Sequence, residues 1–263
     1  MSTLTWILIF SLIGGILSVL AASVFLLLPE AKRTRSLPHM VSFAIGALLG
    51  AAFLGLLPHA LLSPQVEDFH SITLTVLIGI LTFFLLEKLV LWRHCHAIEC
   101  EVHGADDHQK HKHDTAPAGT LVLIGDGVHN FVDGVLIAAA FLTDIHLGVV
   151  TALAVAAHEI PQEVGDFAIL LQSGFSRTKA LVFNMLASLT TVVGALIAYF
   201  SLSAAESFVP YILAIAASSF IYIAVADLIP GLHKRTAAIE SIQQITLISL
   251  GVLVIYTAHS FLH

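Results

Sequence analysis

Long apolar segments make up most of this chain, and they restrict it to structures that a lipid bilayer can hold. Of its 263 residues, 57% are hydrophobic and 11% are charged, whereas soluble domains carry about 25% charged residues. An α-helix of about 20 apolar residues crosses the hydrocarbon core with its backbone groups hydrogen-bonded internally. We predict eight such spans, at residues 5–28, 39–62, 71–92, 118–142, 146–171, 179–202, 208–230 and 242–262. The expected fold is an all-α membrane protein with eight transmembrane helices, forming a single multi-pass domain over residues 1–263.

The basic residues predict how these spans are oriented. All eleven Lys and Arg residues lie in, or beside, the connections after spans one, three, five and seven. Because connections rich in Lys and Arg are retained in the cytoplasm, both termini are predicted to lie outside it. The membrane that we expect is the plasma (inner) membrane.

The ends of spans two and seven resemble each other weakly. Residues 56–59 read Leu-Leu-Pro-His and residues 228–230 read Leu-Ile-Pro. The two spans run in opposite directions in the predicted topology, as the halves of inverted repeats do. We therefore predict an inverted repeat of spans 1–3 and 6–8 around the central spans 4 and 5, and we include His59 as a candidate metal or pathway residue.

The longest polar stretch, residues 93–117, is a predicted cytoplasmic loop that is rich in histidine. Its candidate metal-capturing residues are His94, His96, His103, His108, His111 and His113. Tracts of this composition are typical of metal binding, and the alternative is a plain solvated linker. Cys95 and Cys100 lie in the same stretch, where cytoplasmic thiols stay reduced, so we expect no structural disulfide.

Spans four and five carry ionisable residues near their centres. An ionisable group at that depth costs several kcal/mol and therefore indicates a functional site. Residues three and four apart share a face of a helix. On span four that face carries Asp126, His129, Asn130 and Asp133. The polar residues of span five are His158, Glu159, Gln162, Glu163 and Asp166. None of these residues is Lys or Arg, so a bound cation is the expected partner.

The residue types favour a divalent metal that accepts both nitrogen and oxygen ligands. His129, Asp133, His158 and Glu159 would form a mixed shell of four, which suits zinc better than Mg²⁺ or Ca²⁺. The competing interpretation of a buried histidine is a structural hydrogen bond.

For the other polar residues of the spans, the sequence leaves two or more roles open. Asp126, Asp166 and Asn130 fit a ligand and a structural residue equally well. Glu163 could face a second ion, a proton path or a neighbouring helix. Glu87 on span three and Asp227 on span seven fit a polar pathway lining and a structural hydrogen bond equally well.

Three motifs occur along the spans: FFLLEK at residues 83–88, HNFVDG at 129–134 and HEIPQEVGD at 158–166. They resemble motifs of the ZIP family of zinc- and iron-regulated-type metal transporters. The resemblance covers nearly the whole chain, including the eight spans and the histidine-rich loop. It implies that the chain moves Zn²⁺ into the cytoplasm as its transported substrate, with Fe²⁺, Mn²⁺ or Cd²⁺ as alternatives, through a central site with one or two metal positions.

The resemblance also implies a ligand set. The primary ligand positions match His129, Asp133, His158, Glu159 and Gln162. The second position matches Asn130 together with Glu159 and Gln162. The chain departs from the family pattern twice, because Gln162 is neutral where His or Glu is usual, and Thr191 stands where some members have Glu. These departures favour one principal site, and His158 in place of an acidic residue favours zinc.

Two other functions compete with transport. An intramembrane metalloprotease is suggested by the His-Glu pair at residues 158–159, but the HExxH motif requires a second histidine where this chain has Gln162. A metal sensor without transport activity would use the loop histidines and leaves the buried cluster unexplained. We therefore expect no enzymatic activity. The expected partners are divalent metal ions and the lipid bilayer, without nucleic acid, and a homodimer stays open.

Overall fold

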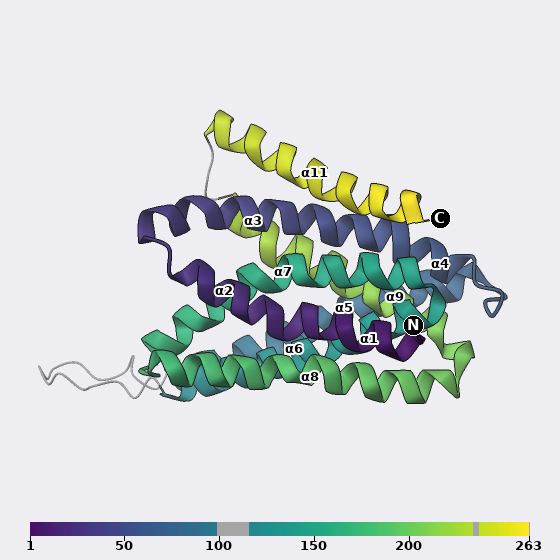
Figure 1. The fold of residues 1–263 in the computed structure, drawn as a ribbon, viewed down its shortest axis with the longest axis horizontal. Helices are drawn as coiled ribbons and strands as arrows, with labels where there is room; N and C mark the ends of the chain where they lie inside the picture. The colour runs from purple at the N-terminus through teal and green to yellow at the C-terminus, as the bar shows by residue number, and fades with distance from the viewer. Residues whose placement is uncertain (99–115, 234–236, 263) are drawn as a thin grey trace, which may run out of the picture.

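The structure, a computed structural model, describes residues 1–98, 116–233 and 237–262, with side chains described for 1–89, 119–233 and 237–260. Within these residues the chain forms a bundle of long helices that run roughly along one axis (Figure 1). Seven helical segments of the described chain have the length and hydropathy of a membrane span. The remaining long helix, α7 (Ile145–Gln172), has 28 residues, and the polar residues of predicted span five lower its hydropathy. The predicted all-α membrane fold is confirmed.

The elements follow the predicted spans in order. Span one consists of α1 (Thr3–Leu12), the π-helical segment η1 (Ile13–Leu17) and α2 (Ser18–Leu26). Span two consists of α3 (Glu30–Gly50), the π-helical segment η2 (Ala51–Leu56) and α4 (Leu57–Leu61), and span three is α5 (Phe69–Ile98). Spans four, five and six are α6 (Ala116–Thr143), α7 and α8 (Arg177–Ser203). After the short turn η4 (Glu206–Phe208), span seven consists of α9 (Val209–Tyr222), the π-helical segment η5 (Ile223–Leu228) and α10 (Ile229–Leu232), and span eight is α11 (Ala238–Leu262).

Two helices extend beyond the predicted spans into polar sequence. Helix α3 begins at Glu30, whereas the predicted span begins at residue 39, so the basic segment after span one is helical. Helix α5 continues to Ile98, so the first residues of the predicted 93–117 loop are helical as well. Hydropathy detects only the apolar part of a helix, whereas Lys, Arg and Glu are good helix formers and prolong it.

The irregular ends of spans two and seven correspond in structure. In each, a six-residue π-helical segment is followed directly by a short α-helix whose second residue is proline, Pro58 in α4 and Pro230 in α10. π-helical turns are rare, so their equivalent placement supports the predicted inverted repeat. In the sequence, the matching irregular ends of the two spans are indicated only by their weak resemblance at residues 56–59 and 228–230.

Both chain ends lie at the same end of the bundle, which also carries α4 (Figure 1). This end is called the terminal end below, and the opposite end, where α2 is joined to α3, is called the loop end. A chain with an even number of spans returns to the side on which it started. The arrangement therefore agrees with eight spans.

The central helices α6 and α7 form a hairpin with a single connecting residue. Asp144 caps α7, because its Oδ1 accepts hydrogen bonds from the backbone N–H groups of His146 (2.8 Å) and Leu147 (3.1 Å). His129 lies fifteen residues before this turn and His158 lies fourteen residues after it. At about 1.5 Å per residue, both histidines lie about 21–23 Å from the turn. The hairpin therefore brings them to the same depth.

Helices α6 and α8 pack with their backbones in contact. A Cβ atom added at Gly134 would lie 1.9 Å from the carbonyl oxygen of Thr191, and one added at Gly194 would lie 2.1 Å from that of Phe131. Only glycine permits this approach. The contact lies directly beside Asp133, so it helps to fix the position of the central polar residues.

Candidate metal centre

Four side chains from α6 and α7 converge halfway along the bundle. They are His129 and Asp133 on α6, and His158 and Glu159 on α7. Each offers a ligand atom that lies within 4.8 Å of those of the other three. Asp133, His158 and Glu159 are buried, whereas the His129 side chain keeps 24% exposure. The structure thus brings together the four residues predicted to form a mixed nitrogen and oxygen shell.

The ligand atoms are spaced as they would be around one zinc ion. The two histidine Nε2 atoms are 3.3 Å apart. The Nε2 of His129 lies 3.2 Å from Oε1 of Glu159 and 3.8 Å from Oδ2 of Asp133. The Nε2 of His158 lies 3.4 Å from the same Asp133 oxygen and 3.8 Å from the same Glu159 oxygen. Tetrahedral zinc with bonds of about 2.0–2.1 Å requires ligand atoms about 3.3–3.4 Å apart. The cluster fits this requirement with shifts of a few tenths of an ångström.

A backbone hydrogen bond orients one of the histidines. The Nδ1 of His158 lies 3.0 Å from the carbonyl oxygen of Ala154, one turn earlier on α7. A carbonyl oxygen can only accept, so Nδ1 carries the proton and Nε2 presents its lone pair to the cluster. Metal-ligating histidines usually have such a partner on the other ring nitrogen. The ring edge of His158 also packs against Phe220 of α9, with ring centroids 6.1 Å apart.

The carboxylates of the cluster contact its two imidazoles. Among the described residues, the side-chain oxygens of Asp133 and Glu159 are buried and form no hydrogen bond beyond these contacts with His129 and His158 at 3.2–3.8 Å. Buried polar atoms are nearly always hydrogen-bonded, and an exception requires an explanation such as an ion. Two buried carboxylates beside two imidazoles, one of them oriented to offer a lone pair, are the arrangement that a divalent cation would complete.

A second acidic group lies directly beside the first. Asp126, Glu159 and Glu163 are all buried, and they also offer ligand atoms within 4.8 Å of one another. Glu163, however, is already hydrogen-bonded to α8: it accepts from the side chains of Asn184 (2.8 Å) and Ser188 (2.9 Å). This group therefore has less free ligand capacity than the first.

Asn130 is held by neighbours on both sides. Its amide nitrogen donates to Oδ1 of Asp126 (2.8 Å), and its carbonyl oxygen accepts from the hydroxyl of Thr191 (2.8 Å). Gln162, the other predicted neutral ligand, is half-buried one turn after His158. Neither belongs to the two groups of His and carboxylate side chains described above.

Sequence reasoning did not identify Asn184 and Ser188 as partners of the site. Together with Thr191, they lie three and four residues apart on α8, which places them on one face toward α6 and α7. The spacing of these three polar residues in an otherwise apolar span could have identified them from the sequence. All three side chains are buried.

The remaining predicted pathway residues lie outside the central cluster. Asp166 is half-buried on α7, two turns beyond Glu159 toward the loop end. Glu87 accepts a hydrogen bond from the Tyr222 hydroxyl, which links α5 to α9, and Asp227 is exposed on η5. His59 lines a cavity at the terminal end.

The predicted loop histidines cannot be placed in the same way. His94 and His96 fall in the final turns of α5, where side chains are not described, and His103, His108, His111 and His113 lie outside the described residues.

The two sides of the cluster differ in packing. Toward the terminal end, α6 and α7 bury a continuous series of large apolar side chains: Leu136, Ile137, Phe141, Leu147 and Val150. Toward the loop end, the next residues on these helices include Asp126 and Asp166. A Cβ atom added at Gly125 or Gly165 would meet nothing within 4 Å. The terminal side of the cluster is therefore lined mainly by apolar side chains, whereas the loop side combines acidic residues with a smaller buried apolar group of Phe167, Leu170 and Ala180.

The membrane-length apolar helices place the chain in the class of integral multi-pass membrane proteins, and the buried cluster is a candidate metal centre. Within that class, the family model described as ZIP Zinc transporter matches residues 2–258. The chain therefore belongs to the ZIP zinc transporter family, as its motifs predict.

Several relatives are named zinc transporters. The chain is 34% identical over 230 residues to zinc transporter ZIP13 of Pongo abelii, covering 83% of this chain and 65% of that protein. It is 32% identical over 275 residues to ZIP13 of Gallus gallus, covering 86% of this chain and 75% of the relative. It is 30% identical over 313 residues to zinc transporter zipt-7.1 of Caenorhabditis briggsae, covering 97% and 80%. These names describe transporters rather than enzymes, and they give the metalloprotease interpretation no support.

Proposed function

We propose that this protein carries zinc across a membrane and releases it into the cytoplasm, with His129, Asp133, His158 and Glu159 as the ligands of the ion in transit. The observation that carries the proposal is the spacing of their ligand atoms, 3.2–3.8 Å for the five measured pairs. Membership of the ZIP family and the names of the relatives support zinc as the substrate. The mixed nitrogen and oxygen shell also suits Fe²⁺, Mn²⁺ and Cd²⁺, which we expect to compete less well.

The same site is proposed to hold one principal ion. A second ion would use Asn130, Glu159 and Gln162, together with the acidic group at Asp126 and Glu163. The Asn130 carbonyl is engaged by Thr191, and Glu163 is engaged by two donors from α8. A second ion would have to displace these bonds, so it would bind more weakly.

The proposed direction follows from the predicted topology. The Lys and Arg residues assign the loop end to the cytoplasm and the terminal end to the outside of the plasma membrane. Large buried apolar side chains lie on the terminal side of the cluster, and the acidic residues Asp126 and Asp166 lie on its loop side, so we take this conformation to be the one that opens toward the loop end. A transporter that alternates its access would release its ion toward the loop end from this state.

The experiment is zinc flux into liposomes that contain the purified protein, measured for the wild type and for His158→Ala. We expect flux to fall to the level of empty liposomes, because His158 is a buried ligand with its lone pair fixed toward the cluster. The matched control is His146→Ala, which removes a histidine from the first turn of the same helix. It should retain most of the flux.

Circular dichroism and gel filtration of each variant separate loss of function from loss of fold. Zinc flux that persists in correctly folded His158→Ala would overturn the assignment of this site. Competition of Fe²⁺, Mn²⁺ and Cd²⁺ with zinc in the same assay ranks the ions, and a stronger effect of Fe²⁺ or Mn²⁺ than of unlabelled zinc would overturn zinc as the preferred substrate.

A further inference from the structure

Two carboxylates lie one helical turn from the central cluster, on its loop side. Asp126 comes three residues before His129 on α6, and Glu163 comes four residues after Glu159 on α7. At about 1.5 Å per residue, these steps are about 4.5 Å and about 6 Å along the helices. An ion that leaves the cluster toward the loop end therefore passes both carboxylates within one helical turn.

Together with Glu159, these carboxylates form a group of their own, which is called the oxygen group below. Asp126, Glu159 and Glu163 each offer an oxygen, and these oxygens lie within 4.8 Å of one another. All three side chains are buried, and neither α6 nor α7 contains a Lys or Arg residue. Three buried carboxylates so close together repel one another unless positive charge lies between them.

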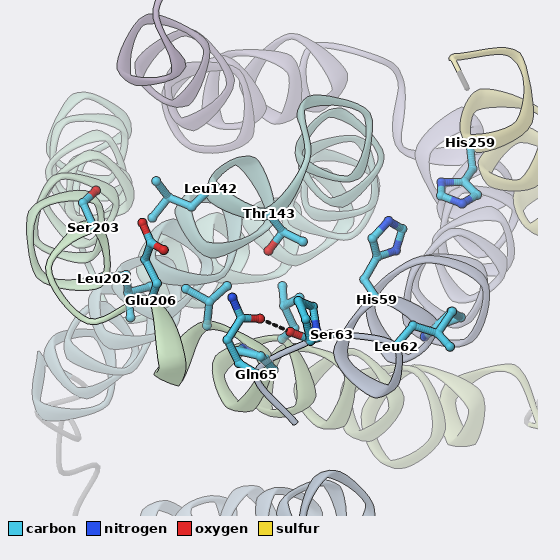
Figure 2. Close-up of a pocket in the computed structure, with 15 residues that line it drawn as sticks. His59, Leu62, Ser63, Gln65, Leu142, Thr143, Leu202, Ser203, Glu206 and His259 are labelled. Atoms are coloured by element: carbon cyan, nitrogen blue, oxygen red, sulfur yellow. Dashed lines mark hydrogen bonds between the residues drawn. The ribbon is translucent and has the colours of Figure 1, made fainter. Parts of the chain in front are cut away.

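The opposite side of the cluster has a different composition. A cavity of about 580 Å³ lies at the terminal end, and Leu142 and Thr143 of α6 are among the residues that line it (Figure 2). Leu142 lies thirteen residues after His129, or about 20 Å along the helix. Glu206 is the one carboxylate among the lining residues of this cavity. The buried carboxylates are therefore concentrated on the loop side of the cluster, away from the cavity.

An amide from α8 adds a fourth oxygen beside the oxygen group. The Nδ2 of Asn184 donates to Oε2 of Glu163 at 2.8 Å, and a carboxylate oxygen accepts, so this bond fixes which end of the amide is the nitrogen. Among the described residues, Oδ1 of Asn184 and Oδ2 of Asp126 are buried without a hydrogen-bond partner. Buried polar atoms are nearly always paired, so two unpartnered oxygens here point to a ligand that carries positive charge.

Glu163 is the weakest ligand of the oxygen group. Asn184 donates to one of its oxygens, and Ser188 donates to the other at 2.9 Å. An ion has to compete with these two donors, which lowers the affinity of the oxygen group below that of the central cluster. Low affinity suits a site that an ion has to leave again.

We propose that Asp126, Glu159 and Glu163, with Oδ1 of Asn184, form a release site that takes the divalent ion from the central cluster and passes it on toward the loop end. Glu159 belongs to both groups, so the ion changes sites without losing this ligand. The release site offers only oxygen, whereas zinc is better suited by a shell that includes imidazole nitrogen. The ion is therefore exchanged more readily from the release site.

The release site uses residues other than the second metal position that the family resemblance implies. That position relies on Asn130 and Gln162 besides Glu159. In the structure Asn130 has a different part, because its amide donates to Oδ1 of Asp126 and leaves Oδ2 to face the ion. This inference rests on the proposed function, since the ion that reaches the release site is the one that the central cluster gives up.

The first test measures zinc flux into liposomes as a function of zinc concentration for Glu163→Gln. Glutamine keeps a carbonyl oxygen that accepts a hydrogen bond from α8, but it removes the negative charge. We expect maximal flux to fall by about tenfold, the lower end of the losses seen when a group beside a metal ligand is changed. Asp126→Asn, which keeps an acceptor for Asn130, should have the same effect. The matched control is Glu67→Gln, which changes an exposed carboxylate at the terminal end and should keep wild-type flux.

The second test locates the ion. Zinc-soaked crystals of the full chain are measured on both sides of the zinc absorption edge. Wild-type crystals should show an anomalous peak at the central cluster. In His158→Ala, which lacks one ligand of that cluster, we expect the peak within the oxygen group. It should disappear in the double variant His158→Ala/Glu163→Gln.

The outcomes of the two tests separate the release site from the proposed function. Wild-type maximal flux in correctly folded Glu163→Gln and Asp126→Asn overturns the release site, and so does the absence of zinc from the oxygen group in His158→Ala. Reduced maximal flux in both variants, together with zinc in the oxygen group, supports it. Zinc flux that survives in His158→Ala contradicts the proposed function instead, and the diffraction result then still decides whether the oxygen group binds zinc.

Discussion

The close contact between α6 and α8 makes Gly134→Ala an informative substitution. The added Cβ would lie 1.9 Å from the carbonyl oxygen of Thr191, where ordinary contacts begin at 3.4 Å. The helices would have to separate by about 1.5 Å at this point, because a backbone carbonyl cannot rotate away as a side chain can. Asp133 is the adjacent residue, so the same movement displaces a ligand of the central cluster.

The expected size of the effect follows from this overlap. Overpacking a tight contact typically costs about 1–3 kcal/mol, and each kcal/mol lowers the unfolding midpoint of a protein of this size by about 2–4 °C. Moving a ligand by more than 1 Å exceeds the roughly 0.5 Å tolerance of a functional site. We therefore expect zinc flux to fall by at least about tenfold, comparable to the loss of a group that orients a metal ligand.

The control is Gly125→Ala on the same helix, where an added Cβ would meet nothing within 4 Å. Alanine is favoured over glycine within a helix by up to about 1 kcal/mol, so this variant should unfold at the same or a higher temperature and keep its flux. The assays are thermal unfolding in detergent and zinc flux into liposomes. Equal unfolding temperatures and equal fluxes for the two variants would refute the reasoning from the helix contact.

Two further predictions concern the central site. Asp133→Asn should greatly weaken zinc binding, because it removes one of the two carboxylate charges of the cluster. Zinc titration calorimetry should show comparable losses of affinity in the His129→Ala and Asp133→Asn variants. Wild-type affinity in Asp133→Asn would contradict the proposed role of Asp133 as a ligand. Thr191→Val leaves the buried Asn130 carbonyl without its 2.8 Å hydrogen bond and should destabilise the protein by about 1–3 kcal/mol while zinc flux is retained. An unfolding midpoint equal to that of the wild type would show that this bond contributes nothing.

Most of the fold could be predicted from the sequence, because a bilayer leaves few solutions for long apolar segments. The proximity of His129 and His158 could be predicted as well, since each lies at a similar distance along its span from the connection between the two spans. Helices α3 and α5 extend beyond the predicted spans, because a hydropathy profile does not detect helix in segments rich in charged residues. The π-helical segments η2 and η5 were not predicted. The sequence marks their positions only through the prolines that follow them.

The parts of the candidate site that depend on spacing within one helix could be predicted from the sequence. The parts that depend on contacts between different helices could not. The meeting of His129, Asp133, His158 and Glu159 follows from residue spacing within α6 and α7. The donors to Glu163 come from α8, 21 and 25 residues later in the chain. Spacing along one helix carries no information about such contacts between helices.

The one-residue turn at Asp144 would make the four proposed ligands a chelating unit. Two proposed ligands lie on each arm of this helical hairpin, whose backbone is already ordered by helix formation and packing, so little chain entropy would remain to be lost when an ion binds. We therefore expect discrimination among cations to depend on the fixed separation of the arms rather than on ordering of the chain. We also expect the ion and both arms to move as one body, with access changed by rearrangement of the helices around them.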